Sequence, residues 1–135
     1  MRRDCTPIWV DGEGRRRPLE RVQLTDRGAY TESFLQETLH ARPELLPVEE
    51  LDADFSPLVS LGREIDAIDN LFVSPSGKLT LVETKLWRNP EATRTVVAQL
   101  LAYATRLSGW SYEQLERNCR GALSPAPLGA TSLYE

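Results

Sequence analysis

Two acidic residues and a lysine flank one tight turn of this chain. Asp69 precedes the turn at residues 74–78, and Glu83 and Lys85 follow it. If the turn is centred near Ser76, antiparallel pairing of its apolar flanks places Asp69 opposite Glu83 on one face of a hairpin. Lys85 joins that face, because side chains two residues apart in a strand point the same way. The hairpin is therefore expected to carry an acidic patch with one lysine, away from its turn.

Opposed carboxylates constrain the chemistry of such a patch. Asp69 and Glu83 repel each other when both are charged, and proteins usually offset such repulsion with a hard cation or a shared proton. A divalent metal is the simpler of these two solutions. The expectation depends on the register, because a turn longer or shorter by one residue would send Asp69 to the other face.

The order of these residues resembles the D…ExK core of the PD-(D/E)xK nuclease superfamily. Ile68-Asp69 stands before the hairpin and residues 83–85 stand after it, with Ile68 where the name-giving proline would be. Gln99 and Tyr103, on the next expected helix, resemble the QxxxY element of the RecB-like and NucS-like branches. The resemblance spans Glu32 to about Gly109 and implies a restriction-endonuclease-like fold.

An acidic residue near the start of the expected first helix extends the resemblance. Residues 31–46 resemble the opening helix of NucS-like nuclease domains. Glu32 lies on the same stripe as Leu35 and Leu39, whereas Glu37 is rotated from it by about 140°. Glu32 is the acidic residue expected to face inward. An alternative role for it is to stabilise the helix N-terminus through the helix dipole.

The resemblance implies metal-dependent hydrolysis of nucleic-acid phosphodiester bonds, with DNA as the expected substrate. Asp69, Glu83 and the backbone carbonyl of Thr84 would hold Mg²⁺ or Mn²⁺. Lys85 would orient the attacking water, and Glu32 would assist the metal or its water.

Further residues are candidates for supporting and binding roles. By the same resemblance, Gln99 and Tyr103 would position Lys85 or the phosphate. Arg63, Trp87 and Arg88 are candidates for nucleic-acid contact, although Trp87 would serve equally well in a core.

Two other interpretations remain open on the sequence alone. A nuclease-like fold can bind nucleic acid or a partner protein without cleaving anything, because folds host unrelated functions. Alternatively, Glu83 and Lys85 form a salt bridge on a solvated face, which would contribute only about 0.2–1 kcal/mol. The aspartate, glutamate and lysine together favour an enzyme.

The pattern of apolar residues and turn signals predicts an α/β protein with three parts. Residues 1–30 are expected to form a β-hairpin extension, residues 31–120 a nuclease-like domain with an αβββαβ core, and residues 121–135 a linker or tail. The expected strands are 7–10 and 18–24 in the extension and 57–63, 64–73 and 78–86 in the core. The expected helices are 31–41, capped by Thr31; 90–108, capped by Asn89 and stopped by Gly109; and 111–120, short and C-terminal.

Composition suits one globular domain. The chain has 135 residues, of which 41% are hydrophobic, and it has no long apolar run, so neither a membrane span nor a secretory signal is expected. Cys5 and Cys119 form no CxxC motif and are expected to be free thiols in the cytoplasm. His40 is the only histidine and is expected to be solvated at a helix end.

Charge is distributed unevenly along the chain. The net charge is −4, which argues against tight nonspecific binding of nucleic acid. The acidic excess lies in residues 32–69, where Arg42 and Arg63 are the only basic residues. The run 15–17 is expected to be an exposed basic turn beside a strand, with phosphate contact as the alternative. A downstream domain of a longer chain, or a second copy, remains a possible partner.

Overall fold

The computed structural model describes residues 6–20, 22, 28–86 and 92–122. Its strands are β1 (Ile8–Val10), β2 (Arg16–Pro18), β3 (Val59–Ile65), β4 (Ile68–Val73) and β5 (Leu79–Val82). Its α-helices are α1 (Glu32–Ala41), α2 (Ala92–Ser108) and α3 (Tyr112–Ala122), and three short 3₁₀ turns, η1 (Pro43–Leu45), η2 (Val48–Glu50) and η3 (Ala53–Phe55), link α1 to β3. The expected α/β class is confirmed.

The central sheet has three antiparallel strands in the order β3-β4-β5. In the β4–β5 hairpin, Asn70 pairs with Val82 and Val73 pairs with Leu79. This is the register expected from a turn centred near Ser76, and its continuation by one residue sets Asp69 opposite Glu83.

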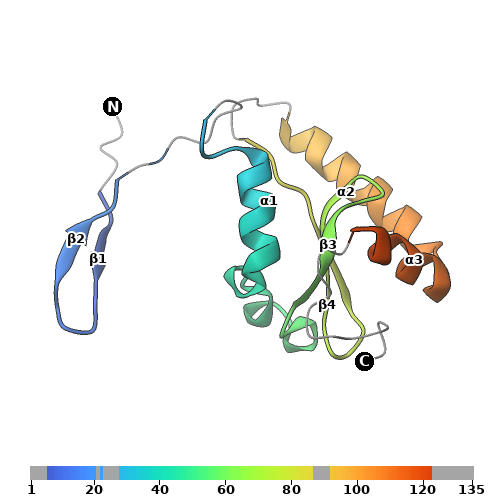
Figure 1. Ribbon diagram of the computed structural model, residues 1–135, viewed down its shortest axis with the longest axis horizontal. Coiled ribbons are helices and arrows are strands. Elements are labelled where there is room, and N and C mark those ends of the chain that lie inside the picture. The colour runs from blue at the N-terminus through green and yellow to red at the C-terminus, as the bar shows by residue number, and fades with distance from the viewer. Residues whose placement is uncertain (1–5, 21, 23–27, 87–91, 123–135) are drawn as a thin grey trace.

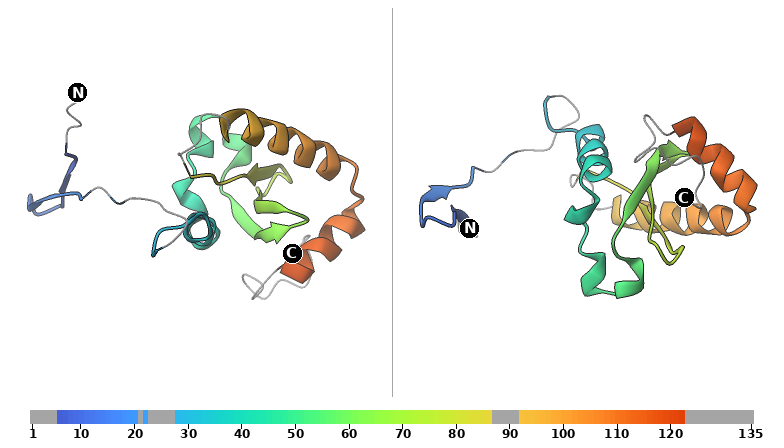
Figure 2. Two further views of the ribbon diagram at one scale, coloured as in Figure 1. Left: turned by 90° about the horizontal axis from the view of Figure 1, so that it is seen from above. Right: turned by 60° about the horizontal axis from the view of Figure 1, so that its bottom comes forward.

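Helices cover both faces of this sheet, as Figures 1 and 2 show: α1 lies on one side, and α2 and α3 lie on the other. The core forms on the side of α2 and α3. Buried Leu61, Ile65, Ile68, Leu71 and Cys119 form its centre, and Tyr103 and Leu107 of α2 pack against it. Burial raises the pKa of the Cys119 thiol to about 11, so Cys119 is a neutral core residue.

Glycine at position 62 allows α3 to approach β3 closely. Gly62 has φ +146°, a backbone conformation that residues other than glycine rarely adopt. A Cβ atom there would lie 3.2 Å from both Ala122 Cβ and Ile65 Cδ1. The end of α3 therefore rests on backbone at this point.

Helix α1 begins where the sequence predicts, because the Thr31 side chain accepts a hydrogen bond from the Phe34 N–H. Two contacts attach this helix to the sheet. Fully buried Asn70 donates from Nδ2 to the Gln36 carbonyl at 2.9 Å, and the Arg63 guanidinium pairs with Glu37. The sheet thus holds α1 through both a buried amide and a more exposed ion pair.

His40 is not the solvated residue expected from the sequence. Its Nδ1 lies 2.7 Å from the Ser60 hydroxyl, and the contact is half-buried. The prediction was wrong because β3 packs beside the end of α1, where its buried Ser60 reaches the His40 ring.

The N-terminal hairpin is confirmed, but its second strand begins earlier than expected. Asp11 accepts hydrogen bonds from the backbone N–H groups of Glu13 and Arg15, which close a short loop. Arg16 and Arg17 therefore belong to strand β2 and not to a basic turn, and the Arg17 guanidinium lies 4.6 Å from the centre of the Trp9 ring. Every residue of both strands is exposed.

The β3–β4 connection also differs from expectation. Strand β3 runs on to Ile65, and the turn is made by residues in the left-handed region, with φ +48° at Asp66 and +70° at Ala67. Glu64, expected at the start of the next strand, belongs to β3 and has φ +53°. Two turn residues and one strand residue, none of them glycine, thus have positive φ here, which no local sequence signal indicated.

After α2, the described residues do not contain the last strand of an αβββαβ core. Gly109 ends α2 with a hydrogen bond to the Arg106 carbonyl, as predicted. Ser111 and Gln114 then bond each other's backbone N–H groups, which starts α3 at once. Helix α3 continues to Ala122, beyond the expected end at residue 120. None of the described helices has the length and apolar character needed to cross a membrane.

We predict that Asn70→Ala lowers the free energy of unfolding by about 1–3 kcal/mol, because the buried Gln36 carbonyl loses its donor. Urea denaturation followed by circular dichroism measures the change. Thr80→Val is the matched control: the Thr80 hydroxyl is buried and has no partner among the described residues, so its removal should be neutral or stabilising. Equal losses in both variants would contradict the assigned role of Asn70.

Candidate functional site

Four charged residues from three segments meet at one end of the sheet. Glu32 comes from the first turn of α1, Asp69 from the start of β4, and Glu83 and Lys85 from the chain just after β5. Figure 1 shows that the start of α1, the chain after β5 and the start of α2 gather at this end. We call these four residues the acidic site.

Asp69 holds the backbone of the opposing strand. Its Oδ2 accepts hydrogen bonds from the Thr84 N–H at 2.8 Å and from the Thr84 hydroxyl at 2.9 Å. The sequence predicted that Asp69 would face Glu83, and the bonded partner is the next residue along. Oδ1 of Asp69 takes no part in these two bonds.

Glu83 is a buried carboxylate with one cationic partner. Its side chain is 2% exposed, and its Oε1 lies 2.8 Å from Lys85 Nζ. The other oxygen, Oε2, is buried and has no hydrogen-bond partner among the described residues. This burial contradicts the interpretation of Glu83 and Lys85 as a salt bridge on a solvated face.

Lys85 contacts Glu83 and is close enough to Glu32 and Asp69 to be affected by their charges. The hydrogen bond to Glu83 raises the pKa of Lys85 above its ordinary value, against the opposing effect of burial. The charges of Glu83, Glu32 and Asp69 add to the increase. The four residues of the acidic site thus comprise one ammonium and three carboxylates.

Glu32 reaches the site as predicted, but its contact is with the main chain. Its Oε1 accepts a hydrogen bond from the Leu86 N–H at 2.8 Å. No sequence signal indicated this partner, because residues 32 and 86 are far apart in the chain. The exposed Glu37, on another face of α1, pairs with Arg63 instead.

Gln99 and Tyr103 lie on α2, the helix that covers the sheet face to which Asp69 belongs. Tyr103 packs against the core cluster that contains Leu71, and Leu71 shares its face with Asp69 by strand alternation. Gln99 precedes Tyr103 by one helical turn, and its Oε1 is buried without a partner among the described residues. A position on the opposite face of the sheet, which would remove both residues from the site, is thus contradicted.

The candidate residues for nucleic-acid contact receive less support. The Arg63 guanidinium is engaged by α1, where it bonds Glu37, Ser33 and Gln36. It therefore braces the helix. Trp87 and Arg88 lie outside the described residues.

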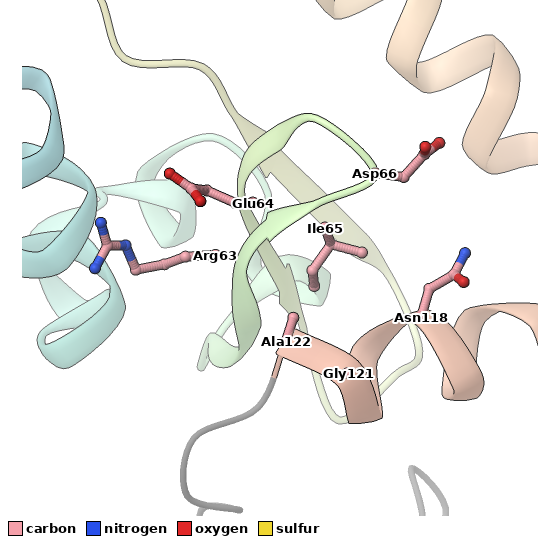
Figure 3. A pocket seen from close by; sticks show the side chains of 7 residues that line it. All are labelled: Arg63, Glu64, Ile65, Asp66, Asn118, Gly121 and Ala122. Atoms are coloured by element: carbon pink, nitrogen blue, oxygen red, sulfur yellow. The ribbon is translucent and has the colours of Figure 1, made fainter.

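A separate hollow of about 520 Å³ lies beside the β3–β4 turn and the end of α3. Its lining includes Arg63, Asp66 and Asn118. Figure 3 shows Arg63 extending towards α1 and Asp66 extending to the opposite side, where an ion pair joins it to Arg106 at 3.1 Å. Because these groups diverge, the hollow does not gather them around a common point.

The acidic site offers two carboxylates, Asp69 and Glu83, as donors for a metal ion. No three histidine, cysteine, aspartate or glutamate side chains within the described ranges are grouped so as to hold a metal by themselves. Mg²⁺ commonly uses one or two carboxylates and completes its shell with water, so this pair is a sufficient donor set. The buried Oε2 of Glu83, which has no partner in the described ranges, fits such a role.

No known protein family, curated protein sequence or solved structure matches this chain. Function therefore has to be inferred from the acidic site itself.

We predict that Lys85→Met destabilises the protein at pH 7, because buried Glu83 keeps its charge without an ammonium beside it. The expected loss is about 1–3 kcal/mol, below the value for a fully buried pair because Lys85 is 35% exposed.

Urea denaturation at pH 7 measures this loss. Adding Glu83→Gln to Lys85→Met should recover most of the lost stability, since the double variant no longer buries an unpaired charge. A deficit that is unchanged in the double variant would show that Lys85 does not compensate Glu83.

Proposed function

We propose that this protein is a metal-dependent nuclease that hydrolyses phosphodiester bonds of nucleic acid, with DNA as the expected substrate. The observation that carries the proposal is the buried Glu83, which binds Lys85 through one oxygen and has no partner for the other among the described residues. The charges of Asp69 and Glu32 act on the same lysine. The resemblance of the sequence to the D…ExK pattern, which implies a restriction-endonuclease-like core, also supports the proposal.

The electrostatics of the acidic site support a cation-dependent reaction. Burying a carboxylate is costly unless a charge partner and hydrogen bonds compensate it. Lys85 compensates one oxygen of Glu83, and the other has no partner within the described part of the chain. A divalent cation shared by Glu83 and Asp69 would offset the remaining negative charge.

The proposed reaction uses three residues of the acidic site and one backbone carbonyl. Asp69, Glu83 and the Thr84 carbonyl would hold Mg²⁺ or Mn²⁺, which would activate a water and neutralise charge on the phosphate. Lys85, held at Glu83 Oε1, would orient the attacking water. Its ammonium would also offset negative charge as the bond to the leaving oxygen breaks.

Helix α2 supplies the second set of proposed contacts. The Oε1 atom of Gln99 is buried and has no partner among the residues that the structure describes, and Tyr103 lies one turn further on, on the helix that covers this face. We assign these two residues to the positioning of Lys85 or of the substrate phosphate. A hydrogen bond from Lys85 or from a water would satisfy the Gln99 oxygen.

A binding module without cleavage is the second candidate function. Such a module would bind nucleic acid or a partner protein. The net charge of −4 favours a partner protein, because a surface with an acidic excess attracts a phosphate backbone only weakly. In that case the acidic site would hold a metal for structure or for a partner, and Lys85 would be dispensable for binding.

We predict that saturating Mg²⁺ or Mn²⁺ raises the melting temperature of the wild type by about 5 °C or more, since a ligand that binds only the folded state stabilises it. Asp69→Asn should abolish this increment. Without metal the variant should match or exceed the stability of the wild type, because a charge is lost while an oxygen remains to accept from Thr84. Differential scanning fluorimetry measures both effects, with exposed Asp54→Asn as the charge-matched control. Equal increments in the wild type and Asp69→Asn would refute the metal assignment.

We predict that Lys85→Ala retains the metal-induced increment yet cleaves DNA about a hundredfold more slowly than the wild type, since the attacking water loses its partner. Exposed Lys78→Ala removes the same charge from the turn at the far end of the hairpin and should cleave at the wild-type rate. The assay follows labelled single-stranded, branched and duplex DNA, together with RNA, in Mn²⁺. If the wild type binds one of these but cuts none, the binding module replaces the nuclease for this chain.

A further inference from the structure

The chain around Lys85 is held from both sides by carboxylates of other segments. On the amino-terminal side, Asp69 of β4 accepts from the Thr84 N–H at 2.8 Å. On the carboxyl-terminal side, Glu32 of α1 accepts from the Leu86 N–H at 2.8 Å. The two bonded amides are the immediate neighbours of Lys85 in the chain.

This arrangement begins where the sheet stops. The described β4–β5 pairing ends with Asn70 opposite Val82, and β5 itself ends at Val82. Beyond that point the backbone N–H groups need other acceptors, because an unpaired amide away from water is costly. Carboxylate oxygens from Asp69 and Glu32 take over the task of the missing strand bonds.

We propose that Glu32 is a positioning residue, which holds the Leu86 amide so that the backbone of Lys85 stays fixed between two anchors. Its role is thus distinct from that of a metal or water ligand, which the comparison with nucleases had assigned to it. The effect on cleavage rests on the proposed function. The effect on the backbone does not.

The need for two anchors follows from the lysine side chain. Lysine carries its charge on a flexible stem of four carbons, so its ammonium goes where its backbone and its partner allow. Glu83 fixes the ammonium end at 2.8 Å, and the bonds at Thr84 and Leu86 fix the backbone end. With the Leu86 hydrogen bond gone, the bond from the Thr84 N–H to Asp69 is the one of these two backbone anchors that remains.

The substitutions Glu32→Gln and Glu32→Ala separate a hydrogen-bond acceptor from a charge. Glutamine keeps a side-chain oxygen at the same reach, so it can accept from the Leu86 N–H without a negative charge. Alanine removes both the acceptor and the charge. Any contribution of Glu32 to the helix dipole is lost in both variants, so a difference between them reports the hydrogen bond.

Amide hydrogen exchange at Leu86, measured by NMR on the full chain, is the primary measurement. We expect Glu32→Ala to accelerate exchange at this amide by about tenfold or more, and Glu32→Gln to stay within about threefold of the wild type. Asp54→Asn removes a charge from an exposed residue of η3 and should leave the Leu86 amide unchanged. Unchanged exchange in Glu32→Ala would overturn the proposal, whether or not the protein cleaves DNA.

Cleavage and metal binding provide the second measurement. If Glu32 acts by position, Glu32→Gln retains the metal-induced rise in melting temperature and most of the cleavage rate, whereas Glu32→Ala retains metal binding but loses cleavage. If Glu32→Gln loses both metal binding and cleavage, Glu32 serves the metal and the proposal is wrong. If the wild type cleaves nothing, the proposed function fails, and the exchange data alone decide the role of Glu32.

Discussion

The antiparallel register of β4 with β5 is the constraint on which the rest of the site depends. Pairing of Leu71 with Leu81 puts apolar side chains of both strands on the face that α2 covers. The same alternation brings Asp69 and Glu83 to that face one step beyond the last paired residues. A slip by one residue would expose the leucines and bury different side chains. The register that buries the core leucines is therefore also the register that forms the acidic site.

Burial of Glu83 is the electrostatic cost of this arrangement. A carboxylate that is 2% exposed and has one oxygen without a partner among the described residues lowers stability unless another group compensates it. The fold tolerates the cost because Lys85 follows two residues later and its Nζ lies 2.8 Å from Glu83 Oε1. Such local destabilisation is typical of functional sites, where charge is arranged for a ligand and not for the stability of the chain alone.

Helix α1 ties the fold to the site. Asn70 of β4 holds the middle of the helix by bonding the Gln36 carbonyl, and the first residue, Glu32, reaches across to the Leu86 amide. One helix thus rests on the buried strand and also fixes the chain that carries the lysine. Displacement of α1 would therefore alter the backbone on one side of Lys85 directly, without any change in the core under α2.

The sequence by itself determined the elements with strong local signals: the Thr31 cap and the Gly109 stop of two helices, and the turn near Ser76 with its register. From that register it also predicted that Asp69, Glu83 and Lys85 would meet, because strand alternation is a local rule. Only the tertiary structure decided which contacts they make. Packing brings Glu32 to the Leu86 amide and His40 to Ser60, and it also sets the left-handed turn between β3 and β4. No pattern of neighbouring residues encodes these features.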